Sequence, residues 1–476
     1  MSAAGTSELA FTPALELAAR IRARELSPVE LTELYLERIE RLDPQLNAFV
    51  HLDADGALAA AHDPHDGPFA GVPIPIKDLT DVAGLPTTYS TKAYARNVAA
   101  ADAAVVRRIR EAGFVVLGKT NTPEFGTIGQ TESELNGACR NPWNLDYTPG
   151  GSSGGAAAAT AAGLCPIAHA TDGGGSIRNP ASCCGLVGIK PSRGRVSPAP
   201  YVPGSLGLGT SGPLARTVRD AAALLDVMSG NEPGDFFVAP APERPFLAEA
   251  ERDPGRLRVA VTIEPPVDVP VDRACAAAAT AAGELLSQLG HEVVEATPPW
   301  RNEDLLVHFI RIWQAGPATA GIDDLSLLEP INRALAENAF AASQPDHVVS
   351  TIALQQAARA LMAFWEDVDV VVTPTLALPP VPIGWTWEDT NGDPHAAFAR
   401  QLLFTPFTPV VNVTGQPAIS LPLHWSDEGL PIGVQLIGGA FAESTLVRLA
   451  AQLEQARPWS ERRPRLEVPA GGRSGS

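Results

Sequence analysis

The sequence has few cysteines, and their number is odd. Among its 476 residues there are five, namely Cys139, Cys165, Cys183, Cys184 and Cys275. This excludes a scaffold held together by several disulfides and favours buried free thiols. Cys183 and Cys184 are adjacent and lack the C-x-x-C spacing of a redox pair, so we expect both to be structural.

Two further features are missing: long apolar runs and an excess of basic residues. No segment is long enough to cross a bilayer, and residues 1–10 lack the basic start and apolar core of a secretory signal. The formal net charge of −19 disfavours binding to nucleic-acid phosphates or anionic lipid. We therefore expect a cytoplasmic protein that has no nucleic-acid or membrane partner and acts on a small molecule. Whether it forms a homodimer is left open.

Metal-binding patterns are also missing. His62 and His65 are close in sequence, but they lie in a turn-rich loop without a further set of ligands nearby, which is typical of exposed histidines. We expect no bound metal.

The most unusual stretch that is present is Gly150–Arg178, which reads GGSSGGAAAATAAGLCPIAHATDGGGSIR. Two glycine clusters with serines flank a run of small residues, which predicts a closely packed helix followed by a short buried strand. Glycine permits main-chain conformations that other residues resist, so the serines can face a cleft. The glycines before Ser176 can also turn several N–H groups toward one point, as a developing oxyanion requires.

A lysine interrupts another apolar segment. Lys77 lies in the run GVPIPIKD at residues 71–78. Taken alone, such a lysine is more often directed to the surface or paired with an acid such as Asp78 or Asp81. Together with two serine clusters it becomes a candidate general base, because a serine hydroxyl needs a base to act as a nucleophile.

These three segments, in this order, resemble those of the amidase signature hydrolases. That family carries a GVPIxIKD segment, a GGSSGG block and a GGSIR-like block, and here Ser176 follows Ser152 by 176 − 152 = 24 positions. Shorter segments agree as well: Gly118–Phe125, Gly212–Thr217 and Gly415–Ala418. Within the family, the chain is similar to bacterial hydrolases of xenobiotic amides, such as those of nylon-oligomer breakdown.

The resemblance implies a fold and a domain organisation. We expect the α/β fold of the family, a large twisted mixed β-sheet covered by helices on both faces, in a single domain over residues 1–469. Helical segments are expected at about 8–43 and 303–365, and the Gly/Ser-rich residues 470–476 are expected to form a disordered tail. The loop Pro379–Asp393 is a candidate lid over the cleft.

The resemblance also implies a catalytic relay. It assigns Ser176 as the nucleophile, Ser152 as a bridging serine after a cis peptide bond, and Lys77 as the base, with neither metal nor organic cofactor. Supporting hydrogen bonds are expected from Ser153 and Asp172. The remaining expected site residues are Gly173, Gly174 and Gly175, whose N–H groups would bind the oxyanion, and Gly126, Thr127 and Ile128, which would contact the substrate.

Two consequences follow from that assignment. A lysine with its ordinary pKa of about 10.4 is protonated at neutral pH, so burial must lower the pKa of Lys77 far enough to leave its amine uncharged. Gly173 also departs from family members that have a larger apolar residue at this position, which makes the oxyanion loop more pliable.

The predicted activity is hydrolysis of linear, aryl or oligomeric amides through an acyl-enzyme, extending to carbamates (urethanes). One alternative is the A subunit of a glutamine-dependent tRNA amidotransferase, although Thr122–Phe125 resembles stand-alone amidases more closely. A second is an α/β-hydrolase esterase that uses Ser153 with His395 or His424. A third is a nucleotide-binding protein with the glycine loop as an anion cradle, but this loop lacks the lysine of a P-loop.

Overall fold

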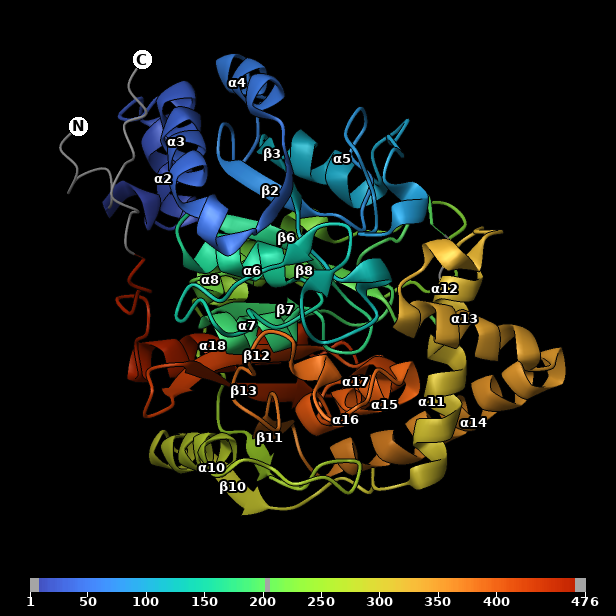
Figure 1. Ribbon diagram of the computed structural model, residues 1–476. Coiled ribbons are helices and arrows are strands. Elements are labelled where there is room, and N and C mark those ends of the chain that lie inside the picture. The colour runs from blue at the N-terminus through green and yellow to red at the C-terminus, as the bar shows by residue number, and fades with distance from the viewer. Residues whose placement is uncertain (1–7, 202–205, 467–476) are drawn as a thin grey trace.

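The computed structural model describes residues 8–201 and 206–466, and at its centre eight strands form one mixed sheet (Figure 1). In spatial order the strands are β10 (Glu292–Glu295), β9 (Arg258–Val261), β11 (Val370–Pro374), β13 (Pro431–Gly438), β12 (Ala418–Trp425), β7 (Val187–Lys190), β8 (Thr210–Ala215) and β6 (Ile167–Asp172). β10, β9 and β11 are parallel, and the other neighbours are antiparallel. This confirms the predicted fold class.

A second, three-stranded sheet carries Lys77. Its order is β1 (Phe49–Leu52), β3 (Val115–Thr120) and β2 (Pro73–Lys77), with β1 antiparallel and β2 parallel to β3. β2 lies beside β6 of the large sheet, where the main-chain N–H of Lys77 donates to Nδ1 of His169 at 3.4 Å. The end of β2 therefore places Lys77 next to the strand that leads into Asp172.

Both faces of the large sheet are covered. The helices around the sheets are α4 (Ala54–His62), α5 (Ala104–Glu111), α6 (Gly154–Ala161), α7 (Arg178–Cys184), α8 (Val218–Met228), α9 (Phe246–Glu249), α10 (Arg273–Gln288), α17 (Pro409–Thr414) and α18 (Glu443–Ala456). Along β11, Val370 and Val372 pack into the apolar cluster that contains residues of α8, α10 and α18, whereas Val371 packs with Val410 of α17. Successive strand residues point to opposite faces, so each face has its own apolar layer.

The N-terminal helices are α2 (Ala14–Arg22) and α3 (Pro28–Leu46). α3 starts with a capping box between Ser27 and Glu30, which satisfies main-chain donors that a helix leaves unpaired at its start. The Asp220 carboxylate of α8 accepts the main-chain N–H of Ala14 at 2.7 Å. This bond fixes α2 to the helical layer of the large sheet.

A further group of helices lies to one side of the sheet (Figure 1). It consists of α11 (Glu303–Trp313), α12 (Ala315–Ala318), α13 (Pro330–Ala341) and α14 (Gln344–Met362). α11 packs against α14, and α12 packs against α13. A single domain over residues 1–469 stays a prediction, and the predicted tail 470–476 lies outside the described residues.

The loop Pro379–Asp393 is packed against the body of the protein. Its short helix η5 (Trp385–Trp387) is anchored by Trp385, which is buried in a cluster with Phe404 of α16 (Gln401–Phe404). The guanidinium of Arg400 lies 4.3 Å from the centre of the Trp385 ring. None of its residues lines the pocket described below, so the prediction of a lid is not supported.

The five cysteines are buried free thiols, as expected. Over residues 8–201 and 206–466, no helix combines the length and apolar character needed to cross a membrane. Within the same part of the chain, no three histidine, cysteine, aspartate or glutamate side chains are grouped so that they could hold a metal ion.

Candidate active site

The serines of the first glycine cluster lie directly before α6. The Gly151–Ser152 peptide bond is cis, as the resemblance implies, and α6 begins at Gly154. This helix packs very closely against its neighbours, because a Cβ on Gly155 would lie only 2.4 Å from the carbonyl oxygen of Ala48. The small residues of the motif therefore serve close packing, which holds the serines in place.

The amine of Lys77 contacts the hydroxyl of Ser152. Lys77 Nζ donates to Ser152 Oγ at 2.7 Å and to Thr171 Oγ1 at 3.0 Å. The Lys77 residue is 0% exposed. Burial holds the pKa of Lys77 well below its usual range, against the opposing influence of the Asp172 carboxylate. An amine in this state can accept a proton from the serine hydroxyl.

The predicted substrate loop approaches Ser152 with its main chain. Gly126 ends the short helix η2 (Glu124–Gly126) and has a φ of +69°. A Cβ at Gly126 would lie 2.8 Å from Ser152 Oγ and 2.7 Å from Leu79 Cδ1. Only glycine combines this conformation with so close an approach.

Ser176 comes to the same region from the second glycine cluster. The N–H of Ser153 donates to the carbonyl oxygen of Ser176 at 3.2 Å, which joins the two clusters. No hydrogen bond links the hydroxyls of Ser152 and Ser176 within the part of the chain that the structure describes. Such bonds are often long before a substrate binds. The proton transfer from Ser176 to Ser152 therefore stays a prediction.

Asp172 organises the loop that leads to Ser176. Its carboxylate accepts the N–H of Gly175 at 2.7 Å and two bonds from the Arg178 guanidinium, each 2.9 Å long. Asn412 donates a further bond to it at 2.9 Å. Burial alone would raise the pKa of the Asp172 carboxyl, but the Arg178 guanidinium outweighs burial and holds that pKa well below its usual range.

The bond from Gly175 bears on the predicted oxyanion site. An N–H that is donated to the Asp172 carboxylate does not face a reacting atom, so this geometry does not support Gly175 as an oxyanion donor. The N–H groups of Gly173, Gly174 and Ser176 donate no hydrogen bond to any residue that the structure describes. They stay candidates for this role.

Ser153 does not face the pocket. It is 0% exposed, and its hydroxyl donates to the carbonyl oxygen of Thr171 at 3.1 Å and accepts the Thr171 N–H at 3.3 Å. Among the described residues, no histidine forms a hydrogen bond with it. Ser153 thus links α6 to β6, its support of the catalytic residues stays a prediction, and among the described residues the esterase alternative lacks its histidine partner.

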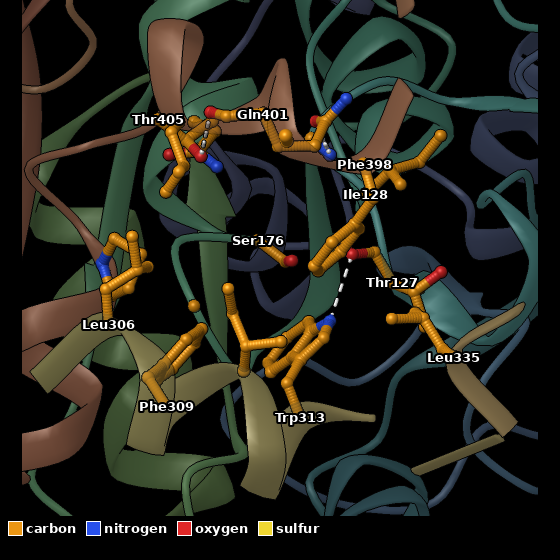
Figure 2. A pocket seen from close by; sticks show the side chains of 18 of the residues that line it. Thr127, Ile128, Ser176, Leu306, Phe309, Trp313, Leu335, Phe398, Gln401 and Thr405 are labelled. Atoms are coloured by element: carbon orange, nitrogen blue, oxygen red, sulfur yellow. Dashed lines mark hydrogen bonds between the residues drawn. The ribbon is translucent and has the colours of Figure 1, made fainter. Parts of the chain in front are cut away.

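A pocket of about 240 Å³ opens at Ser176, whose hydroxyl points into it (Figure 2). The described residues around it are the predicted Gly126, Thr127 and Ile128, the apolar Leu306, Phe309, Ile310, Trp313, Leu335, Phe398, Ala399, Leu402 and Pro409, and Gly129, Gly174, Asn179, Asn338, His395, Gln401 and Thr405. This described lining contains no aspartate, glutamate, lysine or arginine. Burying a charged group without a partner is costly, so this pocket favours substrate groups that carry no charge.

Three groups that hold the catalytic candidates were not predicted from the sequence. Thr171 precedes Asp172 in the motif, so its position offered a local signal. Asn412 in α17 and Gln435 in β13, which accepts from Arg178 at 2.7 Å, come from distant segments with no recognisable pattern. Only the fold brings them to the site.

Replacing Arg178 by methionine is expected to destabilise the protein by about 3–5 kcal/mol. The change leaves the Asp172 carboxylate buried without its counter-charge. Urea denaturation of R178M and wild type measures the difference. R311M is the control. It removes a partly exposed ion pair, in which Arg311 Nη1 lies 3.8 Å from Asp346 Oδ1, and should lower the free energy of unfolding by less than about 1 kcal/mol. Equal losses in the two variants would contradict a structural role for the buried pair.

The loop that contains the predicted substrate residues Gly126, Thr127 and Ile128 is hydrogen-bonded to the start of α13 through carboxyl groups. Glu124 Oε2 accepts the N–H of Glu329 at 2.9 Å and the side-chain amide of Asn332 at 2.8 Å, and Glu329 accepts the N–H of Glu134 at 2.6 Å. Burial raises the pKa of Glu329 to about 8, and the nearby Glu124 and Glu134 carboxylates add to this rise.

The E329Q variant should therefore lose part of the pH dependence of stability. From the ordinary glutamate pKa of about 4.3 up to about 8, the folded state binds more protons at Glu329 than the unfolded state does. Stability from this group is thus lost as the pH rises through that range. Glutamine keeps the shape without the charge, so the Tm of E329Q should exceed that of wild type at pH 9 by about 1–2 °C and match it near pH 4. A lower Tm for E329Q at pH 9 would contradict the raised pKa.

Comparison with known proteins gives a consistent result. The family profile described as Amidase matches residues 30–447. The putative amidase AmiB2 of Mycobacterium tuberculosis is 42% identical over 96% of this chain and 99% of its own. A 6-aminohexanoate-cyclic-dimer hydrolase of a Pseudomonas species is 41% identical over 94% of this chain and 96% of its own. A solved structure of 6-aminohexanoate cyclic dimer hydrolase complexed with substrate matches with a TM-score of 0.91 at 38% identity, over 96% of this chain and 99% of that one.

The amidotransferase alternative is represented by a more distant relative. The A subunit of the glutamyl-tRNA(Gln) amidotransferase of Acidothermus cellulolyticus is 36% identical over 97% of this chain and 97% of its own. Motifs, fold and relatives agree, and the chain belongs to the amidase signature family as a hydrolase that acts on the carbon–nitrogen bonds of amides.

Proposed function

We propose that this amidase hydrolyses uncharged amides through a relay of Ser176, Ser152 and Lys77 and a covalent acyl-enzyme. The observation that carries the proposal is the fully buried Lys77 amine, 2.7 Å from Ser152 Oγ. An ordinary lysine is protonated at neutral pH and cannot act as a base, whereas a desolvated amine with a lowered pKa can.

The reaction begins with proton transfer toward Lys77. Lys77 takes the proton of Ser152, Ser152 takes that of Ser176, and Ser176 Oγ attacks the carbonyl carbon. The Lys77 amine is buried and contacts Ser152 Oγ, so Ser152 is the direct route for a proton between Ser176 and Lys77. The hydroxyl of Thr171, 3.0 Å from Nζ, orients the amine.

The attack turns the carbonyl oxygen into an oxyanion. The N–H groups of Gly173, Gly174 and Ser176 would stabilise it, while Asp172 holds the loop by accepting the N–H of Gly175. The proton on Lys77 then returns through Ser152 to the leaving amine. Water then attacks the acyl group on Ser176 and gives a proton through Ser152 to Lys77. That proton returns to Ser176 Oγ as the carboxylic acid leaves, which restores the free enzyme.

The described lining of the pocket indicates which substrates fit. Glutamine carries an ammonium and a carboxylate, which need charged partners when they are buried, and the described lining offers none. This argues against glutamine as the substrate. Aryl, linear and oligomeric amides with apolar groups next to the carbonyl fit this environment. Carbamates present the same carbonyl and leaving amine, so they fall within the same chemistry.

The test is hydrolysis by the purified chain without partners. The panel consists of 4-nitroacetanilide, a cyclic 6-aminohexanoate oligomer, a linear one whose terminal amine and carboxylate are capped as uncharged amides, an N-phenyl urethane and glutamine. We expect turnover of the anilide and of at least one oligomer or urethane, and none of glutamine. Hydrolysis of glutamine alone would overturn the proposal in favour of the amidotransferase alternative, and no turnover of any uncharged substrate would also reject it.

A further inference from the structure

Gly173 is unusual for a chain that resembles the amidase signature hydrolases, because family members have a larger apolar residue at this position. The structure places another side chain in the space that such a residue would fill. A Cβ on Gly173 would lie 3.2 Å from Cζ3 and 3.3 Å from Cη2 of Trp313. These distances are shorter than ordinary van der Waals contact, so even a methyl group would push against the indole ring.

Trp313 is the last residue of α11 and is held in place from two sides. Its indole N–H donates to the carbonyl oxygen of Thr127 at 3.2 Å, the bond drawn in Figure 2. Its ring stacks on Phe309, with ring centres 5.5 Å apart and planes inclined by 23°. Trp313 therefore joins α11 to the loop of Gly126, Thr127 and Ile128, and these contacts oppose a shift of the ring away from Gly173.

The aromatic pair also covers the neighbouring glycine. A Cβ on Gly174 would lie 3.5 Å from Trp313 Cη2 and 3.7 Å from Phe309 Cζ. Both glycines belong to the loop that carries the candidate oxyanion donors. The indole thus lies directly against the main chain that leads to Ser176.

Apolar side chains lie opposite this pair. Ile128 and Phe398 belong to the same apolar cluster as Trp313, together with Leu335 of α13. Figure 2 shows Ser176 with Phe309 and Trp313 on one side and Ile128 and Phe398 on the other. The space next to the nucleophile is bounded by aromatic and branched apolar groups, an arrangement that suits a flat group better than a puckered one of equal size.

We infer that Gly173 and Trp313 act as a complementary pair that determines acyl-group specificity, selecting flat aromatic acyl groups next to Ser176. Gly173 provides the space, and Trp313 uses it to form a planar wall. A larger residue at position 173 would displace the indole and break its bond to Thr127. This inference rests on the proposed function, because it requires that an acyl group be transferred to Ser176 beside this wall.

The experiment compares two acyl groups of nearly equal size on one leaving group. Wild type, W313A, W313F and G173A are assayed with the 4-nitroanilides of benzoic acid, which is flat, and cyclohexanecarboxylic acid, which is puckered. The readout is the ratio of kcat/KM for benzoyl over cyclohexanecarbonyl, in which a general loss of activity cancels. We expect the ratio to fall at least tenfold in W313A relative to wild type, since the planar wall is removed.

The coupling between the two residues is tested with the double variant G173A/W313F. Phenylalanine is shorter than tryptophan and leaves room for a methyl group at position 173. We therefore expect G173A to lower the ratio at least threefold in wild type and less than twofold in W313F, which is a measured coupling between residues in contact. If G173A lowered the ratio by the same factor in wild type and in W313F, the inference that the two residues act as a pair would be overturned.

Two controls separate the possible failures. W387A removes a tryptophan that does not line the pocket and should leave the ratio unchanged. A second series keeps the acetyl group and varies the amine between aniline and cyclohexylamine. If W313A alters only this second ratio, the wall faces the leaving group and the inference is overturned. If wild type is active but W313A changes neither ratio, the inference fails while the proposed function stands, whereas an inactive wild type rejects the proposed function itself.

Discussion

Replacement of Lys77 by methionine should lower kcat/KM for every substrate by about 10³-fold while leaving the fold intact. Methionine fills nearly the same space but cannot take a proton from Ser152, and general-base catalysis contributes about 10²–10⁴-fold to such reactions. In wild type, kcat/KM should fall as the pH is lowered and the Lys77 amine becomes protonated. The residual activity of K77M should lack this dependence.

K77M also tests an independent prediction, which concerns the stability of the fold. The pKa of Lys77 is lowered in the folded state, so below the ordinary lysine pKa of about 10.4 the unfolded chain binds more protons at this group than the folded protein does. The group therefore opposes folding at neutral pH, and this penalty fades as the pH rises. The Tm of K77M at pH 7 should equal or exceed that of wild type.

Lys119 is the matched control for Lys77. It is also 0% exposed, but it forms an ion pair with Asp78 at 3.0 Å and a hydrogen bond with Thr87 at 2.8 Å. K119M leaves that carboxylate without its partner and should cost about 3–5 kcal/mol of stability. A stable and inactive K77M beside a destabilised K119M is the expected pattern. A K77M enzyme with turnover near that of wild type would reject the relay.

Lys77, Ser152 and Ser176 each lie in a short motif of unusual composition, which makes them candidates, and the resemblance to the amidase signature hydrolases assigned them to one relay. A lysine in an apolar strand, and serines between glycines, conflict with simple packing and so indicate chemistry. The structure brings Lys77 and Ser152 into contact although 75 positions separate them. Burial of the lysine was a requirement deduced from the chemistry, and it could be stated before any coordinates.

The structure does not support the assignment of Gly175 to the oxyanion site, and the reason is local. An aspartate three residues before a glycine commonly accepts the N–H of that glycine, as at the start of a helix. Asp172 does so with Gly175. The pattern D-x-x-G is present in the sequence, and the aspartate side chain competes with an oxyanion for the N–H of Gly175.

The pocket wall could not be predicted from the sequence. Phe309 and Trp313 lie four positions apart on α11, a spacing that serves equally well for packing in the protein interior. Which face of α11 meets the oxyanion loop depends on the packing of α11, α13 and α14, which no short motif encodes. The sequence shows that position 173 has no side chain, but it does not show that the Trp313 ring occupies the space beside it.

Replacement of Ser176 by alanine is expected to reduce turnover by about 10⁴-fold or more, because loss of a nucleophile removes the covalent pathway altogether. A fluorophosphonate probe, which phosphonylates activated serines irreversibly with loss of fluoride, should label Ser176 in wild type and no residue of S176A. In S152A the probe should still react with Ser176, but more slowly, since the route for the proton to Lys77 is interrupted. Tryptic mapping by mass spectrometry locates the adduct.

The position of the adduct also decides between the two serine-based mechanisms. Ser153 lies one residue beyond Ser152, but its hydroxyl is bonded to the main chain of Thr171 in both directions and is 0% exposed. A nucleophile in that state would first have to break two hydrogen bonds, each worth about 0.5–1.5 kcal/mol, and would then have to reach the pocket. Ser176 faces the pocket without rearrangement. A probe adduct on Ser153 would therefore contradict both the relay and the geometry on which it rests.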